Sequence, residues 1–196
     1  TVRAYSGTSM SGWRNPGTIL RLADPTVQSA LNATGGTQIK WSRTAGLEDI
    51  LFTAEKGGAW KRIAYINGQN VLCYTDKSAK AGVTYDYTVR AFKGSLLSDW
   101  HNYKTIRRLN NPTLKSVATS RYGINIRWNK NPYATGYIIY RKTGKGSWTR
   151  IAKINNASAT GFTDTTAAKG VKYTYTIRSY SGSYLSYWNS VRSAVR

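Results

Sequence analysis

Residues 82–90 read Gly-Val-Thr-Tyr-Asp-Tyr-Thr-Val-Arg, and residues 170–178 read Gly-Val-Lys-Tyr-Thr-Tyr-Thr-Ile-Arg. Both stretches alternate in period two and are rich in β-branched and aromatic residues, which is the pattern of a half-buried β-strand. Alternate side chains of a strand point to opposite faces of its sheet. The pattern therefore predicts a long strand in each place, with Tyr173, Tyr175 and Ile177 facing a core.

These stretches belong to a longer internal repeat. Ile39-Lys40-Trp41 recurs as Ile126-Arg127-Trp128, and residues 60–64 recur as residues 148–152. Residues 1–13 match the ends of both copies, residues 88–100 and 176–188. The chain is therefore expected to hold the terminal hairpin of a preceding, incomplete repeat (1–20) and two whole repeats (21–108 and 109–196).

Each whole repeat consists of short alternating runs separated by turn residues, at the spacing of a β-sandwich. In the second repeat we expect strands near residues 112–119, 123–129, 136–142, 148–153, 160–163, 171–180 and 188–194. The predicted fold class is all-β, with tandem seven-stranded antiparallel β-sandwiches of immunoglobulin-like architecture and no helix. Trp41 and Trp128 are the expected core anchors.

The second repeat, from Trp128 through residues 136–142 to residues 170–178, resembles a bacterial fibronectin type III module. It is most similar to the tandem modules of Gram-positive surface or wall-associated proteins. The resemblance places Trp41 and Trp128 at the second-strand tryptophan. It places Tyr85 and Tyr173 at the tyrosine corner, whose hydroxyl ties a loop to the sandwich. The first repeat departs from the pattern at Asp49, which stands where the second repeat has a core-facing tyrosine.

Charge is the strongest departure from an ordinary module. The 196 residues include 29 Lys and Arg against 8 Asp and Glu, a formal net charge of +21. The second repeat carries most of the excess, so Lys142, Lys145 and Lys153 are candidate polyanion contacts. A field of this sign attracts polyanions in a salt-dependent way. The expected partner is an anionic cell-wall polymer or glycan, or a host protein; nucleic acid is not expected. The alternative is a basic surface that only keeps the array soluble.

Strand alternation also predicts a second, outward-facing set of aromatic and arginine side chains. Tyrosine beside arginine is typical of recognition surfaces. The alternative is cross-strand pairing that only stabilises the sheet or packs one module on the next. The residues expected on this candidate binding face are Ile50, Phe52, Arg90 and Phe92 in the first repeat and Ile138, Tyr140, Arg178 and Tyr180 in the second.

Composition argues against an enzyme. One histidine, one cysteine and eight carboxylates leave most acid–base and metal chemistries without a second partner. We expect no catalytic, cofactor or metal site and no membrane insertion. The predicted function is an extracellular spacer and binding array, at the cell surface or cell wall, that retains or presents a larger bacterial protein at the anionic envelope. Two alternatives remain: an accessory module of a secreted glycan- or peptidoglycan-cleaving enzyme, and an adhesin region that binds a host protein such as an immunoglobulin.

The segment 1–20 would have no opposing sheet, and an isolated hairpin is marginal in water. We expect it either to dock on the following module or to complete a neighbouring chain, which would give head-to-tail self-association.

Overall fold

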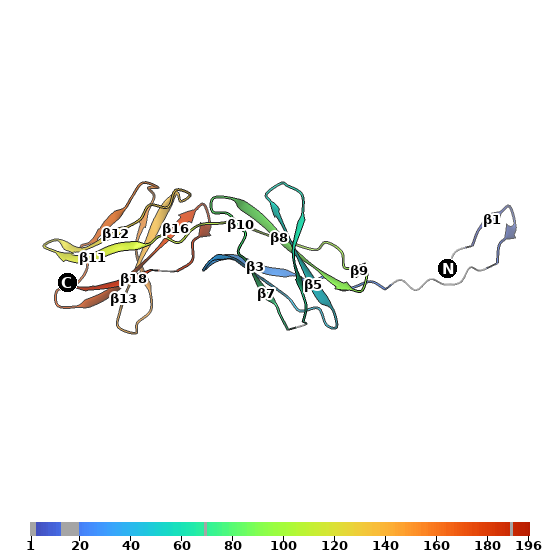
Figure 1. Ribbon diagram of the computed structural model, residues 1–196, viewed down its shortest axis with the longest axis horizontal. Coiled ribbons are helices and arrows are strands. Elements are labelled where there is room, and N and C mark those ends of the chain that lie inside the picture. Colours follow the sequence, from blue (N-terminus) through green and yellow to red (C-terminus); the bar gives the residue numbers. More distant parts are fainter. Residues whose placement is uncertain (1–2, 13–19, 69, 189) are drawn as a thin grey trace.

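The computed structural model describes residues 3–12, 20–68, 70–188 and 190–196. Every regular element among them is a β-strand, and they form two sandwiches in a row with a small hairpin set apart from both (Figure 1). Below, module 1 is residues 21–108 and module 2 is residues 109–196. The predicted all-β fold class is confirmed.

Module 1 is a three-stranded sheet packed on a larger one, and every pairing is antiparallel. The first sheet has the order β3-β4-β7 and the second β10-β8-β5-β6, with the short β9 paired to β8. The bounds are β3 (Val27–Ala33), β4 (Gly36–Trp41), β5 (Glu48–Glu55), β6 (Lys61–Ile66), β7 (Cys73–Asp76), β8 (Thr84–Lys93), β9 (Leu96–Leu97) and β10 (Lys104–Arg107).

Module 2 repeats this arrangement. Its sheets have the orders β11-β12-β15 and β14-β13-β16, with β17 and β18 both paired to β16. The bounds are β11 (Leu114–Ser120), β12 (Gly123–Trp128), β13 (Gly136–Thr143), β14 (Thr149–Ile154), β15 (Gly161–Asp164), β16 (Lys172–Ser181), β17 (Tyr184–Leu185) and β18 (Val191–Val195). Each expected strand of this repeat lies within a few residues of an observed one, and β17 is an addition at the hairpin.

Each module has one core between its two sheets. Trp41 is 1% exposed and Trp128 is 0% exposed, at equivalent places on β4 and β12. Tyr173, Tyr175 and Ile177 of β16 belong to the core of module 2, as the alternation predicts. Burial of such large side chains between two sheets is what stabilises a sandwich of this size.

The first and last strands of each module belong to different sheets, and side chains tie them together. The Asn102 side chain accepts from the backbone N–H of Val27 at 2.7 Å and donates to the Val27 carbonyl at 3.0 Å. In module 2, the Arg192 Nε–H donates to the Leu114 carbonyl at 2.9 Å. Each sandwich is therefore closed along this edge.

The hairpin of β1 (Tyr5–Ser6) and β2 (Ser9–Met10) is fully exposed, with Tyr5 82% exposed. Its two strands pair with each other, and Figure 1 shows it well away from module 1. The expected docking of this hairpin on the following module is therefore wrong, because every residue from 3 to 12 stays exposed. The part of the expectation that concerns residues 13–19 lies outside the described residues.

Candidate functional site

A ladder of aromatic and cationic side chains covers the outer face of the larger sheet in each module. In module 1, the Trp60 and Trp100 rings stack, with centroids 5.7 Å apart and planes 25° apart. The Arg90 guanidinium lies 4.8 Å from the Trp100 ring centroid, and Phe52 meets the same ring edge-on at 4.9 Å. Stacking of this kind holds the cation and the rings in fixed positions.

Module 2 repeats this ladder residue for residue. Trp148 and Trp188 stack with centroids 6.2 Å and planes 24° apart, and Arg178 lies 4.7 Å from the Trp188 centroid. Tyr140 takes the place of Phe52, 4.7 Å from Trp188. Burial lowers the pKa of the Arg178 guanidinium, although the nearby Tyr140 opposes the shift.

The outer face of module 1 is hollowed beside its ladder into an open groove of about 500 Å³. The groove is lined by Ile50, Phe92, Trp100 and Tyr65, among others, and Arg62 and Arg90 lie over the Tyr65 and Trp100 rings respectively. Tyr65 meets Phe92 edge-on at 5.6 Å and is 52% exposed. We call this hollow the aromatic groove.

Three residues of the predicted binding face are largely buried. Ile50 is 5% exposed, Ile138 is 7% exposed and Tyr180 is 8% exposed. The alternation does turn them to the outer face, but the ladder and its neighbours cover them. Lys153, for example, lies 5.1 Å from the centroid of the Tyr180 ring. The other predicted members, Phe52, Arg90, Phe92, Tyr140 and Arg178, are half-buried within the two ladders.

The predicted polyanion contacts differ in their surroundings. Lys145 and Lys153 are exposed, whereas Lys142 is half-buried with its ammonium 5.1 Å from the Trp148 centroid. Asp164 is the acidic residue of module 2, and it is 1% exposed. The solvent-facing side chains of module 2 are therefore cationic or neutral.

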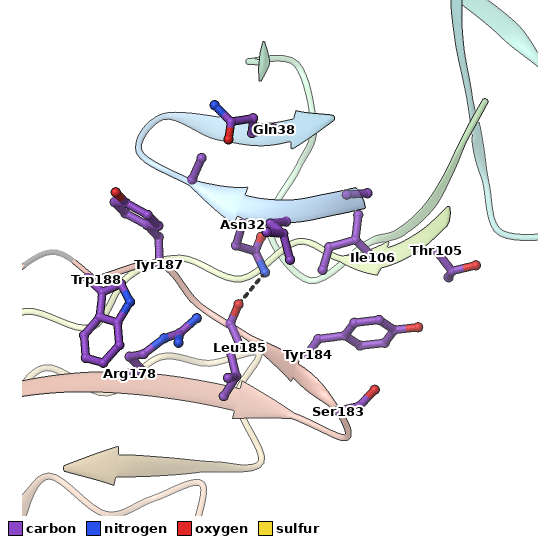
Figure 2. A pocket seen from close by; sticks show the side chains of 13 residues that line it. Asn32, Gln38, Thr105, Ile106, Arg178, Ser183, Tyr184, Leu185, Tyr187 and Trp188 are labelled. Atoms are coloured by element: carbon purple, nitrogen blue, oxygen red, sulfur yellow. Dashed lines mark hydrogen bonds between the residues drawn. The ribbon is translucent and has the colours of Figure 1, made fainter. Parts of the chain in front are cut away.

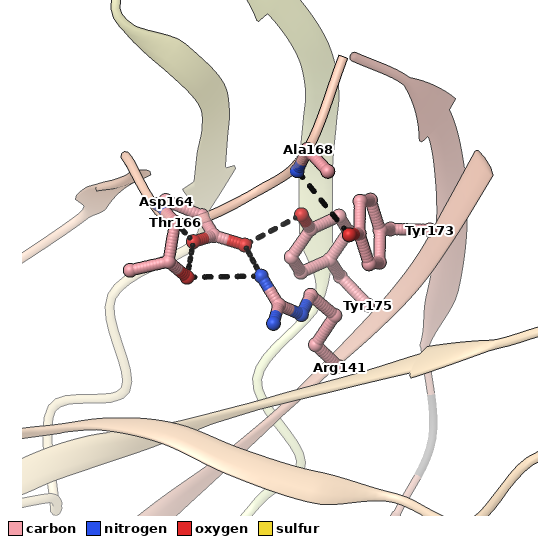
Figure 3. A network of polar contacts seen from close by, with 6 residues as sticks. All are labelled: Arg141, Asp164, Thr166, Ala168, Tyr173 and Tyr175. Atoms are coloured by element: carbon pink, nitrogen blue, oxygen red, sulfur yellow. Dashed lines mark hydrogen bonds and ion pairs between the residues drawn. The ribbon is translucent and has the colours of Figure 1, made fainter. Parts of the chain in front are cut away.

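Asp164 is the centre of a polar network between the two sheets of module 2 (Figure 3). It accepts from Arg141 at 2.7 Å, from the Tyr175 hydroxyl at 2.8 Å and from Thr166. Burial opposes its ionisation, but these donors together hold the pKa of the Asp164 carboxyl below its ordinary value. The network is structural, since every one of its members is bonded within the sandwich.

The tyrosines at the start of the long strands tie a loop to each sandwich. The Tyr85 hydroxyl accepts from the backbone N–H of Lys80 at 3.0 Å, and the Tyr173 hydroxyl accepts from Ala168 at 3.2 Å. Both rings are buried, at 7% and 8% exposure. These are the positions that the resemblance assigned to the tyrosine corner.

The two modules meet at a joint centred on Asn32 of β3. Its side-chain N–H₂ donates to the Arg107 carbonyl and to the Leu185 carbonyl of module 2, both at 3.0 Å, and its oxygen accepts from the Leu109 N–H at 3.0 Å. Figure 2 shows the bond from Asn32 to Leu185 across a crevice of about 480 Å³ between the modules. Tyr184 of module 2 also packs on the core of module 1.

Comparisons with known proteins give partial matches. No family model matches the chain. A segment of 63 residues, 31% of the chain, is 41% identical to an amylopullulanase of Thermoanaerobacterium saccharolyticum, of which it spans 5%. A solved Fn3-like protein from Clostridium thermocellum is 32% identical over 42% of this chain and 90% of its own, with a TM-score of 0.37. A segment of two fibronectin type III domains from chicken tenascin is 15% identical over 89% of this chain and all of its own, with a TM-score of 0.41.

Two features decide the fold family. In each module a three-stranded sheet packs on a larger sheet, and a tyrosine hydroxyl bonds the backbone of the loop that precedes the long strand. The chain consists of tandem fibronectin type III-like domains. Domains of this type are typically non-catalytic modules. The described residues hold no group of three or more histidine, cysteine or acidic side chains placed to bind a metal. They also include no helix long and apolar enough to cross a membrane.

Sequence reasoning missed several residues of the ladder, the groove and the joint in these fibronectin type III-like domains. Trp60 of the ladder and Tyr65 of the aromatic groove were not assigned to the outer face, although the repeat of Trp60 as Trp148 was visible. Asn32 carries no signal in the sequence, because the second repeat has Thr119 at that position. A residue that joins two modules is specific to one junction, so an internal repeat cannot reveal it.

Proposed function

We propose that this tandem is a non-catalytic accessory part of an extracellular bacterial enzyme that cleaves α-linked glucans. The observation that carries this proposal is the 41% identity of one segment to an amylopullulanase. The chain spans 5% of that relative, which fits a small module beside a catalytic domain.

The buried acidic side chains support a non-catalytic role. Glycoside hydrolysis uses a pair of carboxyl groups that flank the scissile bond in an open site. Here Asp49, Asp76 and Asp164 are each buried inside a sandwich, where they accept hydrogen bonds from Trp41, Tyr87 and Tyr175 respectively. Groups held in this way do not face a substrate.

A second candidate function rests on the charge of module 2. A surface whose solvent-facing side chains are cationic or neutral suits retention on an anionic cell-wall polymer, through exposed residues such as Lys145 and Lys153. Such binding is electrostatic, so it should weaken strongly when salt rises from about 50 to 500 mM. The host-protein alternative has no observation of its own in its favour.

A depletion experiment compares the two candidates. The purified chain is mixed with granular starch or with Gram-positive cell walls, in low and high salt, and the protein left in solution is measured. We expect starch to deplete the chain at both salt concentrations, without release of reducing sugar. Depletion by cell walls alone, with release at high salt, would overturn the glucan proposal and favour retention on the envelope.

A further inference from the structure

The two modules share a ladder but differ beside it. In module 1, the Tyr65 ring meets Phe92 edge-on, and the aromatic groove beside them is open. In module 2, the equivalent residues are Lys153 and Tyr180, and the lysine lies over the tyrosine ring. The Tyr180 hydroxyl also donates to the side chain of Asn155. The corresponding surface of module 2 is therefore covered by its own side chains.

The tryptophan rings of the ladder are also more exposed in module 1 than in module 2. Trp60 is 39% exposed, Trp100 is 48% exposed and Tyr103 is 59% exposed, whereas Trp148 and Trp188 are both less exposed. Leu97, which lines the groove, is also 43% exposed. Contiguous apolar surface of this kind on one face of a module indicates an interaction site.

We propose that the aromatic groove of module 1 is a glycan-binding site and that its ligand is a neutral α-glucan chain. This inference rests on the proposed function and adds the site and its ligand. The volume of about 500 Å³ is within the range of small-molecule sites, which combine apolar walls with a few polar groups.

The chemistry of the groove suits a sugar ring. A hexose presents an apolar C–H face, which packs on an aromatic ring, and a rim of hydroxyl groups, which need hydrogen-bond partners. The rings of Trp100 and Tyr65 supply the aromatic surface for the C–H face. Arg62 and Arg90 supply donors for the hydroxyl groups, and each guanidinium lies over a ring, at 4.4 Å from Tyr65 and 4.8 Å from Trp100. One N–H of each is already used, since Arg62 donates to the Tyr65 hydroxyl and Arg90 to the Ser98 carbonyl. A guanidinium has five N–H donors, so others remain for a ligand.

The charge of the proposed ligand, and not that of the groove, separates this site from module 2, because Arg62 and Arg90 make the groove cationic as well. None of the described residues that line the groove is acidic, but an α-glucan carries no charge, so its binding includes no ion pair that salt could screen. An anionic polymer, in contrast, is better served by module 2, which holds 14 Lys and Arg against one buried aspartate. We therefore expect binding in the groove to be insensitive to salt.

The test measures binding of maltoheptaose to the full chain by isothermal titration calorimetry. Trp100→Ala removes one stacking surface. Tyr65→Lys installs the residue that module 2 carries at the equivalent position, which module 2 shows to be compatible with the fold, and should let the lysine cover Phe92. The matched control is Trp188→Ala, which removes the equivalent ring of module 2. Near-UV circular dichroism checks that each variant is folded.

We expect the Kd to rise about tenfold or more in Trp100→Ala and in Tyr65→Lys. We expect it to stay within about twofold in Trp188→Ala and in wild type at high salt. If wild type binds maltoheptaose and both module 1 variants bind as well, the site assignment is wrong while the proposed function stands. If wild type binds neither maltoheptaose nor starch, both proposals fail. Binding that high salt abolishes would overturn a neutral ligand for the groove.

Discussion

Trp41 and Trp128 occupy equivalent buried positions, yet their indole N–H groups differ in their partners. Trp41 Nε1–H donates to the Asp49 carboxylate at 2.8 Å. Module 2 has Tyr137 in place of Asp49, and the Trp128 Nε1 atom is buried without a partner. The aspartate that departs from the repeat pattern therefore satisfies one donor, while its own Oδ1 atom is left buried without a partner.

This arrangement predicts that the free energy of unfolding of module 1 depends on pH. Burial raises the pKa of the Asp49 carboxyl from its ordinary value of 3.8, and the bond from Trp41 opposes that shift. A carboxyl with a raised pKa binds its proton more tightly in the folded state. The free energy of unfolding should therefore decrease as pH rises from about 4 through the pKa of folded Asp49.

Asp49→Asn removes the charge and keeps an oxygen that can accept from Trp41. We expect the variant to be more stable than wild type by about 1 kcal/mol at pH 7, because an ionised carboxylate costs more to bury than an amide. At a pH of about 3.5 the difference should largely vanish, because both states then bind the proton. Urea unfolding at the two pH values measures it, with the exposed Asp99→Asn as control. A variant that is less stable than wild type at neutral pH would contradict this expectation.

At the scale of elements, the period-two pattern was sufficient to place the strands and to separate inner from outer faces. It was not sufficient to predict exposure. Ile138 points outward as the alternation requires, but it is 7% exposed. Whether an outward position is covered depends on neighbouring strands and on the rotamers of long side chains such as Lys153, and neither follows from one strand's own sequence. The aromatic groove depends on the same contacts, so only its residues on β5 and β8 were predicted, which are Ile50, Phe52, Arg90 and Phe92.

The β1–β2 hairpin gives a prediction at the same scale. Two bonds close it on itself: the Ser11 N–H donates to the Ala4 carbonyl at 2.9 Å, and the Ala4 N–H donates to Ser11 Oγ at 3.0 Å. Deleting residues 1–20 should leave the unfolding temperature of both modules unchanged, as measured by calorimetry.

We still expect this exposed hairpin to pair with a neighbouring chain. Sedimentation should then show self-association of the full chain and not of the truncated one. A monomer in both cases would rule this out.

At the scale of the whole molecule, the joint at Asn32 makes the two modules one unit. The Asn32 side chain is 4% exposed and connects β3, the linker and β17. Arg108, whose guanidinium pKa burial lowers, donates to the Leu109 carbonyl at 2.7 Å in the same place. Tyr133 of module 2 packs against Gly82 of module 1, where an added Cβ would clash with the tyrosine ring.

Asn32→Ala should loosen this joint. It leaves the Leu109 N–H without its acceptor and removes the bond to Leu185, a loss of about 2 kcal/mol. We expect small-angle X-ray scattering to show a broader distribution of maximum dimensions, with each sandwich still folded. Asn156→Ala is the matched control, because that exposed side chain bonds the Ser158 N–H of its own loop. Identical scattering from the two variants would show that the joint does not depend on Asn32.

The side-chain ties between the first and last strands have a mechanical consequence. A pull along the chain enters module 2 at Leu114 and leaves it at the end of β18. Since the Arg192 side chain bonds the Leu114 carbonyl, the load falls on these two strands together. They would have to slide past each other before either sheet could open. A module built in this way resists tension through contacts loaded in shear, and it keeps its length until those contacts break.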